Sequence, residues 1–252
     1  MKRLLIFGYG LVCYGVFFVT FLYSVGFVGN FAVPKSIDSA REVAFATALW
    51  TNLALLGLFA VQHSVMARPA FKRWWTRLIP VAAERSTYVL LSSIALIVLF
   101  AFWQPMGGIV WNVESPLGKG LLYGMYAFGF ALVLVSTFLI NHFDLFGLRQ
   151  VWLQLRGRPY TAVSFRMPLM YRYVRHPLYV GWFFVFWATP TMTAAHLVLA
   201  LGTSAYMLMA IRFEERDLIA EHPEYADYRR RVPMLVPFTM RPRPDRPLAL
   251  GR

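Results

Sequence analysis

The sequence predicts an all-α integral membrane protein, a helical bundle of five to six transmembrane segments. Hydrophobic residues make up 58% of the 252 residues and charged residues only 15%, far from the composition of soluble domains. Apolar runs recur at about the 20-residue length that crosses a bilayer as a helix. Lys and Arg collect at the edges of these runs. We therefore expect one domain over residues 1–252, ending in a helical hairpin and a cytoplasmic C-terminal helix.

Four apolar runs predict four transmembrane helices within residues 1–140; they are 4–28, 43–65, 86–104 and 120–140. The first run starts like a signal peptide, but it is too long for one and further spans follow, so we interpret it as retained. The single cysteine, Cys13, lies inside it. One cysteine excludes an intramolecular disulfide and a Cys-based zinc site, and we expect no metal.

A charge-free stretch, residues 178–211, follows the string RHPLYVGW that begins at Arg175. It is too long for one ordinary span and just long enough for two short ones. Its middle, residues 188–196, offers a proline and small polar residues for a turn. We predict a tight helical hairpin. A re-entrant hairpin, or one kinked helix giving five spans, remains open.

The distribution of Lys and Arg orients the chain. Five lie in 66–85, six in 141–176 and nine from Arg212 onward, against two in 29–42 and one in 105–119. The positive-inside rule then places the basic segments and both termini in the cytoplasm, at a bacterial inner membrane. Basic span ends beside membrane lipid also account for the net charge of +13, so we expect no nucleic-acid partner. The tail 239–252 is predicted to be disordered.

Charged residues flank the hairpin at both feet. Pro177 suits the first turn of a helix, so Arg175 and His176 fall at a helix N-terminus, where a carboxylate or phosphate is favoured. Glu214 and Glu215 lie at the other foot. They are candidates to bind a ribose diol or a cationic ligand, or they form salt bridges with neighbouring arginines on a solvated face.

A second polar group gathers at the end of the fourth predicted span. Asn141, His142 and Asp144 come together there, and a histidine near a carboxylate is suited to proton transfer, although a solvated cap is the competing interpretation. His63 and Tyr88 lie at facing ends of the second and third spans. Tyr88 is a possible hydrogen-bond partner for a substrate or a histidine, whereas for His63 we favour a capping role.

The segment 222–238 is amphipathic and aromatic, and contains Tyr225 and Tyr228. It predicts either an interfacial helix on the bilayer or a lid over a bound ligand.

The strings RHPLYVGW, EERDL and HPEYADYRRRVP, joined by the charge-free stretch, resemble the C-terminal half of the membrane methyltransferases related to isoprenylcysteine carboxyl methyltransferase. That group includes phospholipid N-methyltransferases and NnrU-like proteins. The resemblance covers residues 170–238 and implies that S-adenosyl-L-methionine binds on the cytoplasmic side. It implies the following cofactor-binding residues: Arg175, His176, Pro177, Leu178, Tyr179, Gly181, Glu214, Glu215, Tyr225 and Tyr228.

The N-terminal strings QHSVMARPAFKRWW, ERSTYVLLSS and STFLINHFDLFGLRQVW resemble the bacterial methanethiol S-methyltransferases. This implies S-methylation of a small thiol, methanethiol to dimethyl sulfide. Residues 141–176 would then form a cytoplasmic active-site loop, and 177–238 a cofactor-binding hairpin with a lid helix.

A thiol is a weak nucleophile until it loses its proton, so a base is required. Our candidate is His142, oriented by Asp144 or Asn141, with Tyr88 as a partner. Two alternatives stay open: the same cofactor with a prenylcysteine carboxylate or an amine-headgroup lipid as acceptor, and a non-enzymatic NnrU-like protein. The sequence leaves open the oligomeric state and which glutamate contacts the cofactor.

Overall fold

The structure, a computed structural model, describes residues 1–40, 43–162 and 168–239. Five of its helices are long and apolar enough to cross a membrane. They are α1 (Lys2–Gly29), α2 (Phe45–Ala67), α4 (Glu84–Phe102, with the short turn η1, Val81–Ala83, before it), α5 (Pro116–Ile140) and α9 (Ala194–Glu221). The predicted all-α bundle is confirmed, and the chain is an integral membrane protein.

The long helices pack as a layered bundle in which α1 and α2 both lie along α4, and α9 lies against α2. The most extensive contact joins α5 to α8 (Pro177–Trp187). These two helices cross at Gly129 and Gly181, where a Cβ atom on either glycine would lie 2.8 Å from the other's carbonyl oxygen. Small residues let helices approach closely in lipid, so this crossing holds α8 tightly against α5.

The hairpin predicted over 178–211 is present, but its arms are unequal. Helix α8 has 11 residues and α9 has 28. At about 1.5 Å per residue, α8 covers about half of a hydrocarbon core of roughly 30 Å, so it does not cross as a helix. The expectation of two short spans is corrected: α9 continues past residue 211 to Glu221, and Glu214 and Glu215 lie inside it.

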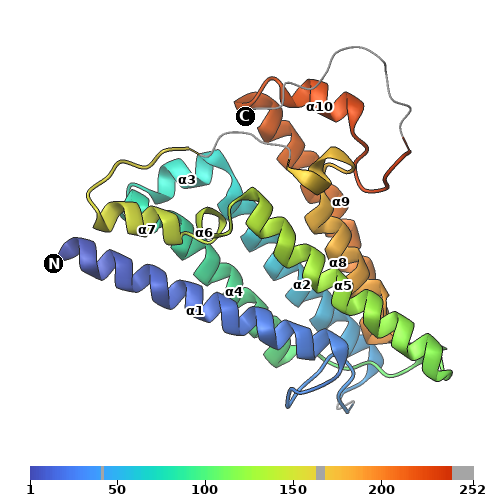
Figure 1. Cartoon of the computed structure of the whole chain (residues 1–252). Coiled ribbons are helices and arrows are strands. Elements are labelled where there is room, and N and C mark those ends of the chain that lie inside the picture. Colours follow the sequence, from blue (N-terminus) through green and yellow to red (C-terminus); the bar gives the residue numbers. More distant parts are fainter. Residues whose placement is uncertain (41–42, 163–167, 240–252) are drawn as a thin grey trace.

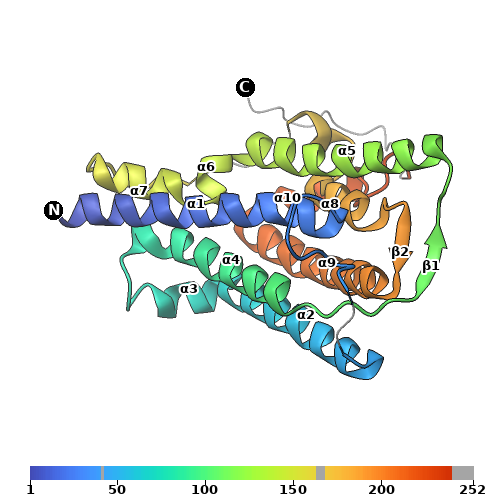
Figure 2. The ribbon, with the colours of Figure 1, turned by 90° about the horizontal axis from the view of Figure 1, so that it is seen from below.

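The turn of the hairpin falls within the predicted segment and forms a small sheet that the sequence did not predict. Strand β2 (Thr191–Thr193) follows α8 and pairs antiparallel with β1 (Ile109–Asn112), which precedes α5 (Figure 2). The pairing fixes the turn of the hairpin to the loop between α4 and α5.

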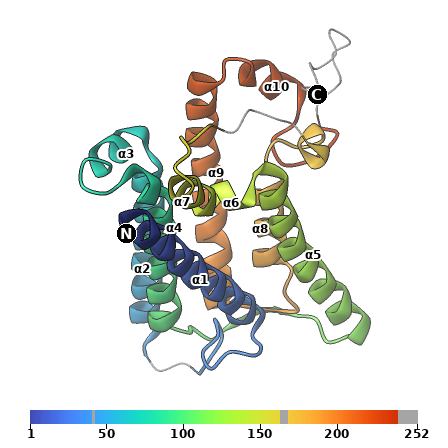
Figure 3. The same ribbon diagram turned by 60° about the vertical axis from the view of Figure 1, so that its left-hand side comes forward.

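The short helices gather at the opposite end of the bundle from this sheet (Figures 1 and 3). They are α3 (Pro69–Trp75), α6 (His142–Leu145), α7 (Leu148–Leu155), the turn η2 (Leu169–Arg172) and α10 (Tyr225–Arg231). The segments richest in Lys and Arg are thus brought to one end, as the charge pattern indicates. Their cytoplasmic location stays a prediction. Residues 240–252, in the tail expected to be disordered, lie outside the described residues.

Candidate functional site

A buried ionic cluster joins the start of α8 to α9 and α10; we call it the Glu215 cluster (Arg175, His176, Glu215 and Arg229). Arg175 Nε donates to Glu215 Oε1 at 2.7 Å, and His176 Nε2 lies 3.1 Å from the same oxygen. Arg229 Nε lies 3.2 Å from Glu215 Oε2. Arg175 also donates to the carbonyl oxygens of Arg229 and Val232. Both carboxylate oxygens of Glu215 are therefore engaged.

The backbone before α8 explains why these side chains meet α9. Pro177 is the first residue of α8, where its missing N–H costs nothing. The amides of Arg175 and His176 donate to the carbonyls of Pro233 and Met234 instead. The chain after α10 is thus fixed beside residues 175 and 176, and side chains of both ends close over Glu215, which is 4% exposed.

The helix predicted within 222–238 is present as α10 and packs its tyrosines inward, while its role as a lid stays a prediction. Tyr225 and Tyr228 are buried, with ring centroids 5.3 Å apart, and burial raises the pKa of both hydroxyls. The Tyr228 hydroxyl donates to the carbonyl of Tyr171 at 2.6 Å, which joins α10 to η2.

Glu214 occupies a different environment from its neighbour; we call this region the Glu214 face (Tyr171, Tyr179 and Glu214). Glu214 is exposed and accepts a hydrogen bond from the Tyr179 hydroxyl at 3.0 Å. The Tyr171 hydroxyl is buried and has no hydrogen-bond partner among the described residues. Burial, and then the nearby Glu214 carboxylate, raise its pKa. This face offers a carboxylate and a donor hydroxyl to a ligand.

The resemblance also assigned Gly181 and Leu178 to the cofactor. Gly181 packs against α5, where a Cβ would meet Gly129 and Val133. Leu178 is half-buried at the first turn of α8. The close helix crossing accounts for the glycine in the RHPLYVGW string.

His142 has partners other than those the sequence suggested. Its Nε2 lies 2.8 Å from the Tyr14 hydroxyl and its Nδ1 2.8 Å from Thr137 Oγ1. Because Thr137 donates its own proton to the carbonyl of Leu134, it accepts from Nδ1–H, and Nε2 accepts from Tyr14. Burial lowers the pKa of His142, which favours this neutral tautomer.

The groups expected to orient His142 are used elsewhere. Asn141 Oδ1 accepts from the backbone N–H of Asp144 at 3.2 Å and so caps α6. Asp144 pairs with Arg149 Nη1 at 2.8 Å and accepts from the Tyr160 hydroxyl at 3.2 Å. Among the hydrogen bonds of the described residues, the imidazole is bound by Tyr14 and Thr137 in place of the expected Asn141 and Asp144. Whether His142 acts as a base stays a prediction.

Tyr88 pairs with His63 instead. Its hydroxyl lies 2.9 Å from His63 Nε2 and 3.1 Å from Nδ1, and Ser92 Oγ lies 3.2 Å from Nδ1; we call these residues, with Tyr206, the His63 cluster. Tyr88 and Ser92 are four residues apart on α4, so they share a face. In the sequence, the four-residue spacing of Tyr88 and Ser92 was the signal that His63, which we interpreted as a cap, has polar partners on a neighbouring helix.

The two polar regions share helix α9. Tyr206, of the His63 cluster, lies eight residues before Glu214 on this helix, or about two turns. The Glu214 carboxylate in turn accepts from Tyr179 of α8, and Tyr206 contacts His63 of α2.

The chain is similar over most of its length to curated proteins. It is 56% identical over 239 residues to a methanethiol S-methyltransferase of Crocosphaera subtropica, covering 94% of each chain. It is 53% identical over 242 residues to one of Mycobacterium tuberculosis, covering 96% of this chain and 99% of the relative. It is 54% identical over 247 residues to methanethiol S-methyltransferase 2 of Bradyrhizobium diazoefficiens, covering 97% and 95%.

No protein-family model matches the chain. No solved structure matches it either. The curated relatives alone decide the family, and their identity and coverage agree with the resemblance carried by the N-terminal strings. The chain belongs to the methanethiol S-methyltransferase family.

Proposed function

We propose that this protein transfers a methyl group from S-adenosyl-L-methionine to methanethiol, forming dimethyl sulfide, at the cytoplasmic face of the membrane. The observation that carries the proposal is that the Glu214 face and the His63 cluster share α9, with Glu214 and Tyr206 about two turns apart. One offers groups suited to a polar cofactor, and the other lies beside an apolar space between helices. Methyl transfer needs two reactants held in line and shielded from water, and the two regions supply two neighbouring places.

The residues of the Glu214 face fit the cofactor. S-adenosyl-L-methionine carries a carboxylate, an ammonium group, a ribose diol, an adenine ring and a sulfonium, and when bound it supplies the methyl group. Glu214 and the unpartnered Tyr171 hydroxyl suit the diol or the ammonium group. The Tyr179 ring suits a cation, because an aromatic face attracts positive charge.

We propose that the remaining predicted cofactor residues hold the helices of the Glu214 face in place rather than contact the cofactor. Arg175 and His176 bind the Glu215 carboxylate. Tyr225 and Tyr228 of α10 pack against Leu218 and Ile219 of α9. We propose that these contacts position α9. Pro177, Leu178 and Gly181 set the start of α8 and its crossing with α5. In this proposal the RHPLYVGW string acts chiefly by building the site.

The test is product formation by detergent-purified protein. Incubation with S-adenosyl-L-methionine and methanethiol should release dimethyl sulfide into the headspace, and calorimetry should show cofactor binding. Matched reactions replace methanethiol with a prenylcysteine or with phosphatidylethanolamine. Cofactor binding with methylation of either of those alone contradicts the thiol assignment. Absence of cofactor binding contradicts the whole proposal.

A further inference from the structure

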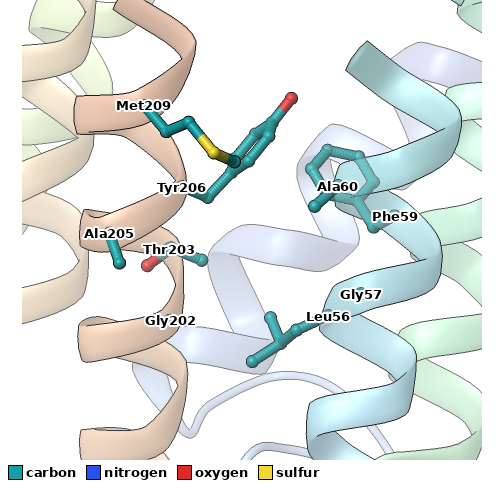
Figure 4. Close-up of a pocket in the computed structure, with 9 residues that line it drawn as sticks. All are labelled: Leu56, Gly57, Phe59, Ala60, Gly202, Thr203, Ala205, Tyr206 and Met209. Atoms are coloured by element: carbon teal, nitrogen blue, oxygen red, sulfur yellow. The ribbon is translucent and has the colours of Figure 1, made fainter. Parts of the chain in front are cut away.

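An apolar cavity of about 300 Å³ lies between α2 and α9 (Figure 4). It is lined by Leu56, Gly57, Phe59, Ala60, Gly202, Thr203, Ala205, Tyr206 and Met209. Figure 4 shows the Tyr206 ring reaching from α9 across to α2. This volume is at the small end for ligand sites, and an apolar lining suits a small apolar molecule.

His63 does not line this cavity but contacts two residues that do. Its ring stacks on Phe59 with centroids 5.1 Å apart and lies 6.5 Å from the ring of Tyr206. Phe59 and Tyr206 both line the cavity, and the Tyr206 hydroxyl lies 3.1 Å from Ser64 Oγ. The apolar cavity therefore has polar groups beside it, at Tyr206, Ser64 and His63.

Charged groups of both signs lie around the His63 cluster. The guanidinium carbon of Arg85 lies 5.1 Å from the centroid of the Tyr88 ring, on the same helix. Glu84, from the start of α4, and Glu214, from α9, are the carboxylates that act on the Tyr88 hydroxyl. The positive charge of Arg85 stabilises a thiolate but opposes a protonated imidazole, whereas the two carboxylates act in the opposite sense on both groups.

We propose that methanethiol binds between α2 and α9, with its methyl group in the cavity and its sulfur toward His63, and that the His63 imidazole accepts the thiol proton. This inference rests on the proposed function. The S–H bond breaks and an N–H bond forms on the imidazole. The electron pair left on the thiol sulfur forms the new bond to the methyl group, and the pair of the broken methyl–sulfonium bond stays with the donor. The Tyr88 hydroxyl orients the imidazole.

His142 is less suited to this step. Both of its ring nitrogens are held by Tyr14 and Thr137, and Phe138 stacks on its ring at 4.3 Å. A thiol would have to displace a hydrogen bond and an aromatic ring to reach it. The His63 nitrogens are also hydrogen-bonded, by Tyr88 and Ser92, so hydrogen bonding does not separate the two histidines. What separates them is position, because the His63 ring packs against Phe59, which lines an apolar cavity suited to the substrate.

The decisive experiment is the pH profile of kcat/KM for His63→Gln. Loss of a general base reduces the rate by about 100-fold or more near neutral pH. The loss should shrink as the pH rises toward the pKa of the alkanethiol, which lies above the value of about 8.5 for a cysteine side chain, because thiolate then forms without the base. Cofactor affinity should stay within about twofold. The matched control is His222→Gln, at the end of α9, which should keep the wild-type profile.

Several outcomes overturn the inference while the proposed function stands. In one such outcome the wild-type enzyme makes dimethyl sulfide and the His63→Gln variant has the same pH profile of kcat/KM as the wild type. Another is an equal loss at every pH, which indicates a structural role. A pH-selective loss in His142→Gln, absent from His63→Gln, would move the base to His142. If His63→Gln does not fold, Tyr88→Phe takes its place, and an unchanged profile there has the same meaning. A wild-type protein without product refutes the proposed function instead.

The cavity is tested separately by filling it. Ala205→Leu adds bulk at the lining and should raise KM for methanethiol about tenfold, the effect of a misfitted methylene or more in an apolar pocket. Its cofactor affinity should not change. The matched control is Ala54→Leu, an exposed position of α2 outside the lining, which should leave KM unchanged. Equal KM values in the two variants would place the thiol elsewhere.

Discussion

Glu214 and Glu215 are adjacent in sequence, yet they belong to regions of opposite character. Glu215 is buried, and both of its carboxylate oxygens are engaged by Arg175, His176 and Arg229. Glu214 is exposed and accepts a hydrogen bond from Tyr179. Successive residues of a helix point about 100° apart, so Glu215 reaches Arg229 of α10 while Glu214 reaches Tyr179 of α8.

The difference separates groups that hold the fold from groups that remain available to a ligand. A polar group buried in a membrane protein needs partners whether or not it has a chemical role, so burial and charge alone do not identify a site. The number of partners is more informative. By this criterion His142, held at both nitrogens, resembles Glu215, whereas Tyr171, whose hydroxyl has no partner among the described residues, resembles Glu214. His63 is also held at both nitrogens, and only its contact with the cavity-lining Phe59 sets it apart from His142.

The largest expected effect is on stability, in Glu215→Gln. Removing one member of a buried ion cluster leaves the other charges uncompensated, at a cost of about 3–5 kcal/mol. We expect a strongly lowered Tm in detergent, followed by intrinsic fluorescence, and exposure of α10 to proteolysis. A variant that melts like the wild type would show that the Glu215 cluster does not hold α10, and the comparison of the two glutamates would fail.

The second effect is on binding, in Glu214→Gln. A hydrogen bond to a charged group contributes about 1.5–3 kcal/mol, so the Kd for S-adenosyl-L-methionine should rise about ten- to a hundredfold. The Tm without ligand should stay near the wild-type value, because the side chain is exposed. Calorimetry and thermal unfolding together check this pair of outcomes. A lowered Tm with unchanged Kd would exchange the roles of the two glutamates.

Composition and charge were sufficient to predict the fold because the bilayer imposes length and sidedness. The first four spans, the turn near residue 190 and the helix within 222–238 all follow from local rules. The unequal arms did not, since the length of α8 depends on the Gly129–Gly181 crossing and on the pairing of β1 with β2. Those are contacts between segments far apart in the chain.

The site was predictable only as a set of candidates. Motif strings located the hairpin residues, but a string does not show which of two adjacent glutamates faces the ligand. Proximity in sequence suggested that Asp144 orients His142, whereas the structure uses Tyr14, from a helix more than a hundred residues away. The same reasoning undervalued His63, whose partners Tyr88 and Ser92 come from another helix.

A third, smaller effect concerns His142 and acid. Burial lowers its pKa, so between that value and about 6.5, its ordinary pKa, the unfolded chain binds the proton that the folded chain does not. Stability should therefore fall as the pH drops below about 6.5, by at most roughly 1.4 kcal/mol per pH unit. Tm measured at pH 7.5 and 5.5 should show a smaller acid-induced drop in His142→Gln than in the wild type. Equal drops would mean that His142 is not held neutral.

The smallest effect, in Tyr171→Phe, tests the comparison most closely, because it should act in opposite directions on stability and binding. A buried hydroxyl without a partner destabilises the unliganded fold, so its removal should leave Tm unchanged or slightly raised. If the hydroxyl serves the cofactor, the same change should raise Kd several-fold, the equivalent of about 0.5–1.5 kcal/mol for a neutral hydrogen bond. Tyr228→Phe is the matched control, because its hydroxyl bonds to the carbonyl of Tyr171 within the protein. It should lower Tm and leave Kd nearly unchanged. If Tyr171→Phe behaved like this control, the hydroxyl would have a partner within the fold, and the Glu214 face would lose its donor.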